Sequence, residues 1–119
     1  MISHAHAARP AECCGVLIGK DAIVVEAAPA RNLAVDPGRY LIDPADHIEA
    51  RRLARARGLD VVGFYHSHPH SPPVPSETDL REAMYEDSLY VIVGLGGVTP
   101  EIRSYRLRGG AFVELELVG

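Results

Sequence analysis

The feature that most constrains this fold is an apolar run, residues 59–66, between a helical segment and a proline-rich stretch. Before the run, Asp43 is a typical helix cap and Pro44 a typical first-turn residue, so we expect a helix over 43–57. After the run, four prolines within 68–75 prevent regular structure from continuing. The run itself is therefore predicted to be a largely buried strand.

Other apolar and turn-rich segments predict the remaining elements. We expect a helix over 2–9, a hairpin of strands over 14–19 and 22–27, a short strand over 39–42, a helix over 76–85, and strands over 88–93, 101–107 and 112–118, the last two joined by a turn at Gly109 and Gly110. Some strands are joined by hairpins and others by a helix that crosses over the sheet. The expected fold class is α/β, a mixed β-sheet flanked by helices, in a single domain over 1–119.

Composition excludes several classes of protein. The net charge of −4 argues against a nucleic-acid binder that depends on phosphate contacts, and no apolar run reaches the length of a membrane span. The first residues lack a secretory signal, so we expect a cytoplasmic protein. Cys13 and Cys14 are adjacent, which excludes a disulfide scaffold and thiolate zinc motifs. Six histidines accompany one lysine, so a metal site would have to use imidazole and carboxylate.

The histidines form three His-x-His pairs, which secondary structure separates. His4 and His6 lie in the predicted first helix, where residues two apart point in nearly opposite directions. His66 and His68 lie where the predicted strand ends, and residues two apart on a strand share a face and can bind one ion. His70 has left the strand and is the weaker partner of His68. Two solvated or backbone-bonded polar side chains are an equally simple interpretation of His66 and His68.

A third ligand for zinc is offered by Asp79, in the first turn of the predicted helix that follows the prolines. Ser76 and Asp79 also have the spacing of a capping box, which needs no functional explanation. The two interpretations compete for one carboxylate, and from these two residues alone capping is favoured.

Seven residues separate the segment His66-Ser67-His68 from Ser76, and two more separate Ser76 from Asp79. This pattern, with Pro69 directly after His68, resembles the zinc motif of the JAMM (MPN-plus, or JAB) metallopeptidases. Residues 10–19 are similar to the family segment that carries the catalytic glutamate. The resemblance covers nearly the whole chain and implies the JAMM/MPN α-β-α architecture, which is similar to that of cytidine deaminases. The deaminase signature itself is absent, which argues against base deamination.

The resemblance implies a set of roles. His66, His68 and Asp79 would bind Zn²⁺, Glu12 would be the general base, and Ser76 would hydrogen-bond the oxyanion. The reaction would be hydrolysis of an amide bond by a zinc-activated water, without a covalent intermediate. The resemblance, and not any pattern in the residues, selects Glu12 among the glutamates.

The short chain resembles the small prokaryotic form of the family, because it has no room for insertions that grip two ubiquitins. The implied partner is a ubiquitin-like or sulfur-carrier protein with a C-terminal Gly-Gly tail, which would add as a strand along an exposed sheet edge leading to the zinc. The sequence leaves open the cognate carrier, the turnover rate, and whether the leaving group is cysteine, a peptide or a lysine-linked target. It also leaves open whether the chain is a monomer or a homodimer.

Two other functions are weighed against this one: a non-catalytic MPN-type scaffold or binding module, and a zinc hydrolase of small amides. A further open point concerns four arginines on the predicted helix over 43–57, which either form a solvated face or contact an acidic carrier: Arg51, Arg52, Arg55 and Arg57.

Overall fold

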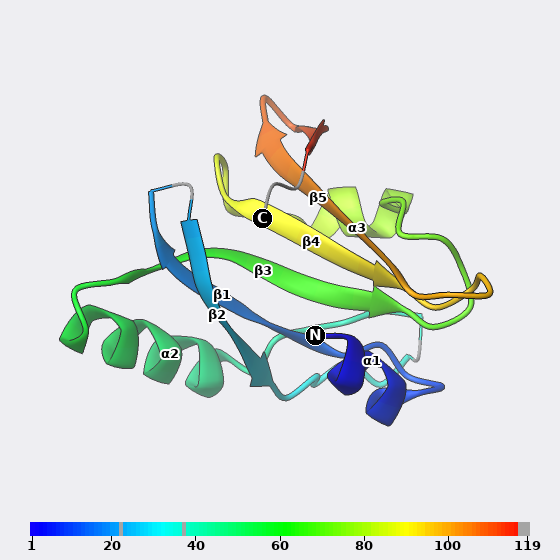
Figure 1. The fold of residues 1–119 in the computed structure, drawn as a ribbon, viewed down its shortest axis with the longest axis horizontal. Coiled ribbons are helices and arrows are strands. Elements are labelled where there is room, and N and C mark those ends of the chain that lie inside the picture. The colour runs from blue at the N-terminus through cyan, green and yellow to red at the C-terminus, as the bar shows by residue number, and fades with distance from the viewer. Residues whose placement is uncertain (22, 37, 117–119) are drawn as a thin grey trace.

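The computed structural model describes residues 1–21, 23–36 and 38–116, which form one six-stranded sheet and three helices (Figure 1). The elements in chain order are α1 (Ile2–Ala8), β1 (Cys14–Lys20), β2 (Ile23–Ala30), α2 (Pro44–Ala56), β3 (Asp60–His68), α3 (Glu77–Glu82), β4 (Leu89–Gly94), β5 (Glu101–Arg108) and β6 (Ala111–Leu115). The strand order is β2-β1-β3-β4-β5-β6, in which only β3 and β4 are parallel. The mixed sheet confirms the predicted fold class.

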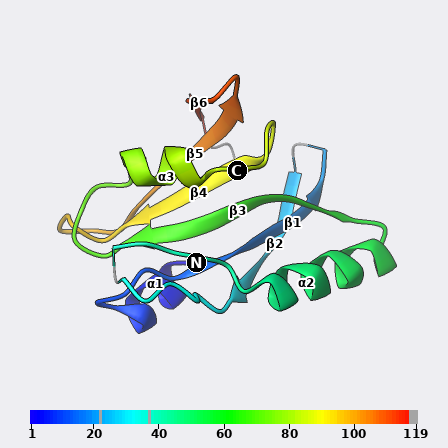
Figure 2. The same ribbon diagram turned by 180° about the vertical axis from the view of Figure 1, so that it is seen from behind.

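Side chains alternate along each strand, so the sheet has two faces that each carry apolar residues, and helices cover both. Leu17, Tyr65 and Val91 belong to an apolar cluster that includes Ala5 of α1. On the other face, Phe64 belongs to a second cluster that includes small residues of α2. The α-β-α layering is therefore present, with α2 lying along β1 and β2 in both views (Figures 1 and 2).

Helix α2 begins where capping rules predict. The Asp43 side chain accepts a hydrogen bond from the Ala45 amide at 2.9 Å, and Pro44 occupies the first turn. Ala50 and Ala54 face the sheet, and their short side chains allow the helix to pack closely against it. No helix of the described residues is both long and apolar enough to cross a membrane.

Strand β3 lies inside the sheet, between β1 and β4. It continues through His68, two residues beyond the predicted strand, because its last residues still pair with β4, where His68 lies opposite Gly94. The edges of the described sheet are β2 and β6. Both flanks of β3 are paired, so a tail that adds as a strand would have to pair with β2 or β6. The expected strand addition along an exposed edge stays a prediction.

The predicted strand over 39–42 is also wrong. The described residues there form only one isolated bridge, between Asn32 and Ile42. The Leu41 amide donates to the Asn32 side chain at 2.9 Å instead of to a neighbouring strand. Figure 2 shows the segment between β2 and α2, cyan in colour, folding back on itself before the helix begins.

Several predicted ends also shift, most of all that of the strand predicted over 22–27, which runs over Ile23–Ala30. The helix predicted over 76–85 ends at Glu82, because Ala83 has an extended backbone. The last predicted strand begins one residue early, at Ala111, and is observed to Leu115, while residues 117 and 118 lie outside the described residues. Gly109 and Gly110 form the predicted turn, both at positive φ, a conformation that favours glycine.

Candidate metal centre and active site

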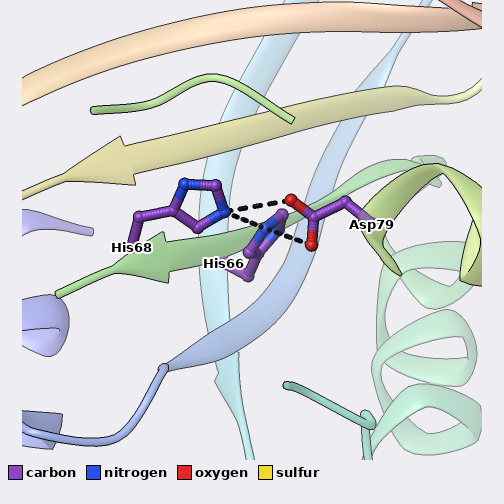
Figure 3. A group of neighbouring side chains, drawn as sticks. All are labelled: His66, His68 and Asp79. Atoms are coloured by element: carbon purple, nitrogen blue, oxygen red, sulfur yellow. Dashed lines mark hydrogen bonds and ion pairs between the residues drawn. The ribbon is translucent and has the colours of Figure 1, made fainter. Parts of the chain in front are cut away.

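Three side chains from β3 and α3 converge on one point. The Nε2 atoms of His66 and His68 lie 3.2 Å apart, and both face the carboxylate of Asp79. His66 Nε2 lies 3.2 Å from Asp79 Oδ1, and His68 Nε2 lies 3.0 Å from Asp79 Oδ2. All three side chains are buried. Figure 3 shows the two imidazoles pointing at the same carboxylate, as expected for alternate residues on one face of a strand.

The capping box and the cluster coexist on Asp79. Asp79 Oδ2 accepts a hydrogen bond from the Ser76 amide at 2.9 Å, and the Asp79 amide donates to Ser76 Oγ at 3.0 Å. The expectation that the two interpretations compete for this carboxylate is wrong, because two carboxylate oxygens offer about four acceptor positions. The cap orients Asp79 toward the histidines instead of turning it away.

Burial and charge set the protonation of the cluster. Burial alone would raise the pKa of Asp79, but hydrogen bonds from both imidazoles and the Ser76 amide hold it well below its usual range. Burial lowers the pKa of His66 and keeps its ring neutral. Burial opposes charge on His68 as well, yet its bonds to Asp79 and to the Pro72 carbonyl raise its pKa.

Neighbouring groups fix the orientation of both imidazoles. His68 Nδ1 donates to the Pro72 carbonyl oxygen at 3.0 Å, so the proline-rich loop directs Nε2 toward Asp79. The His66 ring is stacked on Tyr40, with centroids 4.3 Å apart and planes 18° apart. Sequence reasoning missed Tyr40, since it placed this residue in a strand.

The chemistry of this donor set fits zinc. Zinc binds imidazole nitrogens at about 2.0–2.1 Å, so two such ligands on a tetrahedral ion lie about 3.3 Å apart, close to the 3.2 Å between the two Nε2 atoms. In the metal-free fold both Nε2 atoms donate to Asp79; without their protons, the two Nε2 lone pairs and the carboxylate would suit a shared cation. The ligand atoms of all three residues lie within 4.8 Å of one another.

Glu12 lies between α1 and β1, and only 7% of its surface is exposed. Burial raises its pKa to about 7, although the nearby positive charge of His68 acts in the opposite direction. Within the described residues, its buried Oε1 atom has no hydrogen-bonding partner. Glu12 therefore has the protonation behaviour of a group that exchanges a proton near neutral pH.

A cavity of about 440 Å³ joins these groups, since Glu12, His68 and Ser76 all line its wall. Ser76 is exposed there, and because its Oγ already accepts from the Asp79 amide, its own hydroxyl proton is available to another acceptor. The structure thus brings together all five residues singled out from the sequence, three in the cluster and two beside it.

A second cavity, of about 210 Å³, lies on the face of the sheet covered by α2 and is mostly apolar. Tyr40, which stacks on His66, forms part of its wall. The rest of its wall is formed by Leu41, Ile42, Pro44, His47, Phe64, Glu82, Met84, Tyr85 and Tyr90.

The chain is similar to known proteins of one family. A family model described as prokaryotic homologs of the JAB domain matches residues 1–108. The chain is 40% identical over 111 residues to a desampylase of Haloferax volcanii, covering 91% of this chain and 78% of that protein. It is 32% identical over 117 residues to a CysO-cysteine peptidase of Mycobacterium bovis, covering 96% and 80%.

A solved structure gives the same fold. The crystal structure of a JAB1/MPN domain protein from Archaeoglobus fulgidus is 26% identical and superposes with a TM-score of 0.59, covering 99% of this chain and 90% of that one. The six-stranded mixed sheet with helices on both faces is therefore a JAB1/MPN fold.

Proposed function

This chain belongs to the family of prokaryotic homologues of the JAB domain, and on that basis we propose that it is a zinc-dependent peptidase. Its substrate is a ubiquitin-like or sulfur-carrier protein, cleaved at the amide bond that follows a C-terminal Gly-Gly. Residues 1–119 act as one peptidase domain. The observation that carries the proposal is the buried His66, His68 and Asp79 cluster, which lies beside Glu12.

His66, His68 and Asp79 would hold the zinc. When bound, zinc would supply a Lewis acid for the scissile carbonyl and would lower the pKa of water to near neutrality. The fold prepares two of the three ligands, because Asp79 is ionised and the His66 ring is neutral. The third ligand differs, since the bonds of His68 to Asp79 and Pro72 raise its pKa against the effect of burial, and that proton would have to leave for zinc to bind.

Glu12 moves the proton. A carboxylate with a pKa of about 7 can accept a proton from water near neutral pH and return it to the departing amine. Its low exposure limits exchange of that proton with bulk solvent. Ser76 donates its free hydroxyl proton to the oxygen on which negative charge develops.

The two cavities suggest how the substrate lies. The leaving amine must reach Glu12, so the leaving group occupies the Glu12 cavity, which Glu12 and Ser76 line. The carrier's own tail then extends in the other direction, past Tyr40 toward the apolar cavity. A short tail without side chains, such as Gly-Gly, suits this passage better than a bulky one.

The names of the relatives support a protein conjugate as substrate. One relative is a desampylase and the other a CysO-cysteine peptidase. These names point to different leaving groups, so the reaction of this chain is best tested with several.

The test uses the zinc-loaded protein and carrier fusions that continue after Gly-Gly with cysteine, with a peptide or with a lysine-linked protein. Mass spectrometry should show cleavage directly after Gly-Gly, and a fusion with Ala-Ala in its place should be cleaved poorly. Chelation of the metal should stop the reaction, and added zinc should restore it.

Three results would contradict the proposal. A failure to cleave any fusion, with zinc bound, would exclude the peptidase. Tight binding of carriers without turnover would favour a binding module. Equal rates on short free peptides and on carrier fusions would favour a hydrolase of small amides.

A further inference from the structure

A single peptide group joins Glu12 to Cys13, and side chains from two distant segments hold both of its polar atoms. The Glu12 carbonyl oxygen accepts a hydrogen bond from Asn32 Nδ2 at 3.0 Å. The Cys13 amide donates to Ser67 Oγ at 2.8 Å. The peptide plane that follows the proposed proton carrier is thus fixed from two sides.

Ser67 lies between the two histidines on β3 but points to the opposite face of the sheet. It is fully buried beside an apolar cluster, where an unpaired hydroxyl would be costly. The Cys13 amide lies one residue before β1 begins, and the Ser67 hydroxyl is the acceptor it finds. The Ser67 amide in turn donates to the Cys13 carbonyl at 3.1 Å, which locks the two chains together.

Asn32 is the only side-chain carboxamide in the sequence, which contains no glutamine. Its Nδ2 donates to the carbonyl oxygens of Glu12 and Arg39, and its Oδ1 accepts from the amides of Ala34 and Leu41. These four bonds use both of its donors and both of its acceptor positions. Asn32 therefore ties the backbone at Glu12 to the segment that carries Tyr40.

The orientation of this peptide plane decides where the Glu12 side chain points. Glu12 Oε1 is buried and finds no partner among the described residues, so its own hydrogen bonds do not fix it. We propose that Asn32 and Ser67 are positioning residues that hold Glu12 in place relative to His66 and His68. They act as a pair through the one peptide group, and this inference rests on the proposed role of Glu12.

The kinetic test compares Asn32→Ala and Ser67→Ala with a matched control. Each variant should lower kcat on a carrier fusion by about 10- to 100-fold, because small displacements of a catalytic group have effects of this size. Ser67→Ala should keep KM within about threefold, since Ser67 lines neither cavity. Both variants should keep zinc at one ion per chain, since neither residue is one of the proposed ligands.

The control is Ser104→Ala. Ser104 is also a buried serine with one hydrogen bond from its hydroxyl, to the Leu115 carbonyl at 3.2 Å, but it lies on β5. It should keep kcat within about twofold. Ser67→Thr retains the hydroxyl and should recover most of the kcat that Ser67→Ala loses.

Asn32→Asp separates the two halves of the Asn32 network. It keeps acceptors for the Ala34 and Leu41 amides but, when ionised, cannot donate to the carbonyl of Glu12 or to that of Arg39. It should therefore lose as much kcat as Asn32→Ala. If it retains the wild-type kcat, Asn32 only shapes its own segment and the proposal fails.

Hydrogen exchange of backbone amides tests whether Asn32 and Ser67 act as a pair, and it needs no activity assay. Asn32→Ala should speed hydrogen exchange of the Cys13 amide by about tenfold, although Asn32 does not contact that amide. In the double variant with Ser67→Ala, the loss of kcat should be smaller than the product of the two single losses.

Unchanged exchange at Cys13, or equal kcat in Ser67→Ala and Ser104→Ala, would overturn the proposal. If the wild type cleaves no fusion, the proposed function fails, while the exchange result still decides the pairing.

Discussion

The two cavities described above border the segment 38–42, and the walls of both are mostly apolar, but they differ in their titratable groups. The Glu12 cavity, lined by Glu12, His68 and Ser76, holds groups that are costly to bury and that can move protons. The apolar cavity, lined by Phe64 and Tyr85 among others, has His47 and Glu82 in its wall but none of the three residues of the cluster. The difference indicates that changes in the first should affect chemistry, whereas changes in the second should affect substrate binding.

The largest expected effect is loss of the metal that the proposed ligands would hold. Asp79→Asn and His68→Ala should each reduce bound zinc from one ion per chain to near zero and abolish cleavage. Each change removes one of the three proposed protein ligands, and the remaining two would hold zinc weakly. Metal analysis of the purified variants measures the effect.

Two variants control for indirect causes. His70→Ala removes an exposed histidine two residues after His68 and should retain zinc. Asp43→Ala removes the cap of α2 and shows what loss of a helix cap alone does to zinc binding. Full zinc in Asp79→Asn would show that the carboxylate is a helix cap only.

Loss of the proton carrier should come next. Glu12→Gln should retain one zinc per chain yet lower kcat by about 10²–10⁴-fold, the usual contribution of general acid–base catalysis. Glutamine keeps the shape of the side chain but cannot accept the proton. Zinc content and kcat are measured on the same preparation, and a kcat within tenfold of wild type would exclude Glu12 as the base.

The same substitution should stabilise the metal-free fold in a pH-dependent way. Folding raises the pKa of Glu12 from its ordinary value near 4.5 to about 7, so the folded chain holds this proton more tightly than the unfolded chain. Stability is therefore lost as the pH rises from about 4.5 to about 7. Glu12→Gln avoids that loss and should raise the free energy of unfolding by up to about 3 kcal/mol at pH 8, with little change at pH 4.

Urea unfolding of both metal-free proteins at pH 4, 6 and 8 measures this difference. If the difference in unfolding free energy between the two proteins does not depend on pH, burial does not raise the pKa of Glu12. That result would remove the contrast between the two cavities.

The sequence predicts those parts of the site whose residues lie close together along the chain, and not those whose residues lie far apart. The shared face of His66 and His68 follows from strand periodicity, and the place of Asp79 follows from the spacing after Ser76. Both are local rules. The choice of Glu12 needed the family resemblance, because no periodic pattern links it to a strand fifty residues away.

The stacking of Tyr40 on His66 could not be predicted in this way. The apolar residues around Tyr40 look like a strand, but the polar side chain of Asn32 takes the backbone hydrogen bonds that a strand would need. The single asparagine in the chain was the available signal, and its partners could be identified only in three dimensions.

The apolar cavity should give a smaller effect, and on binding. Tyr85 is 37% exposed and contacts Phe64, with ring centroids 4.8 Å apart. Tyr85→Ala should raise KM for a carrier fusion by about fivefold and leave kcat unchanged, since the change removes apolar wall and no reacting group. Leu53→Ala removes a comparably exposed apolar side chain from α2 and should not change KM. An unchanged KM in Tyr85→Ala would place the carrier tail elsewhere.

The smallest expected effect is on KM and should distinguish two arginines of α2. Arg51 reaches the apolar cavity, because its Nε donates to His47 at 2.9 Å and its guanidinium lies 5.9 Å from the Tyr85 ring centre. Arg52 instead pairs with Glu49 on the exposed surface. Arg51→Ala should therefore raise KM about twofold and weaken its dependence on salt, whereas Arg52→Ala should change neither. Equal increases in both variants would mean that the carrier contacts the whole arginine face; an increase in Arg51→Ala alone would confine the contact to the cavity mouth.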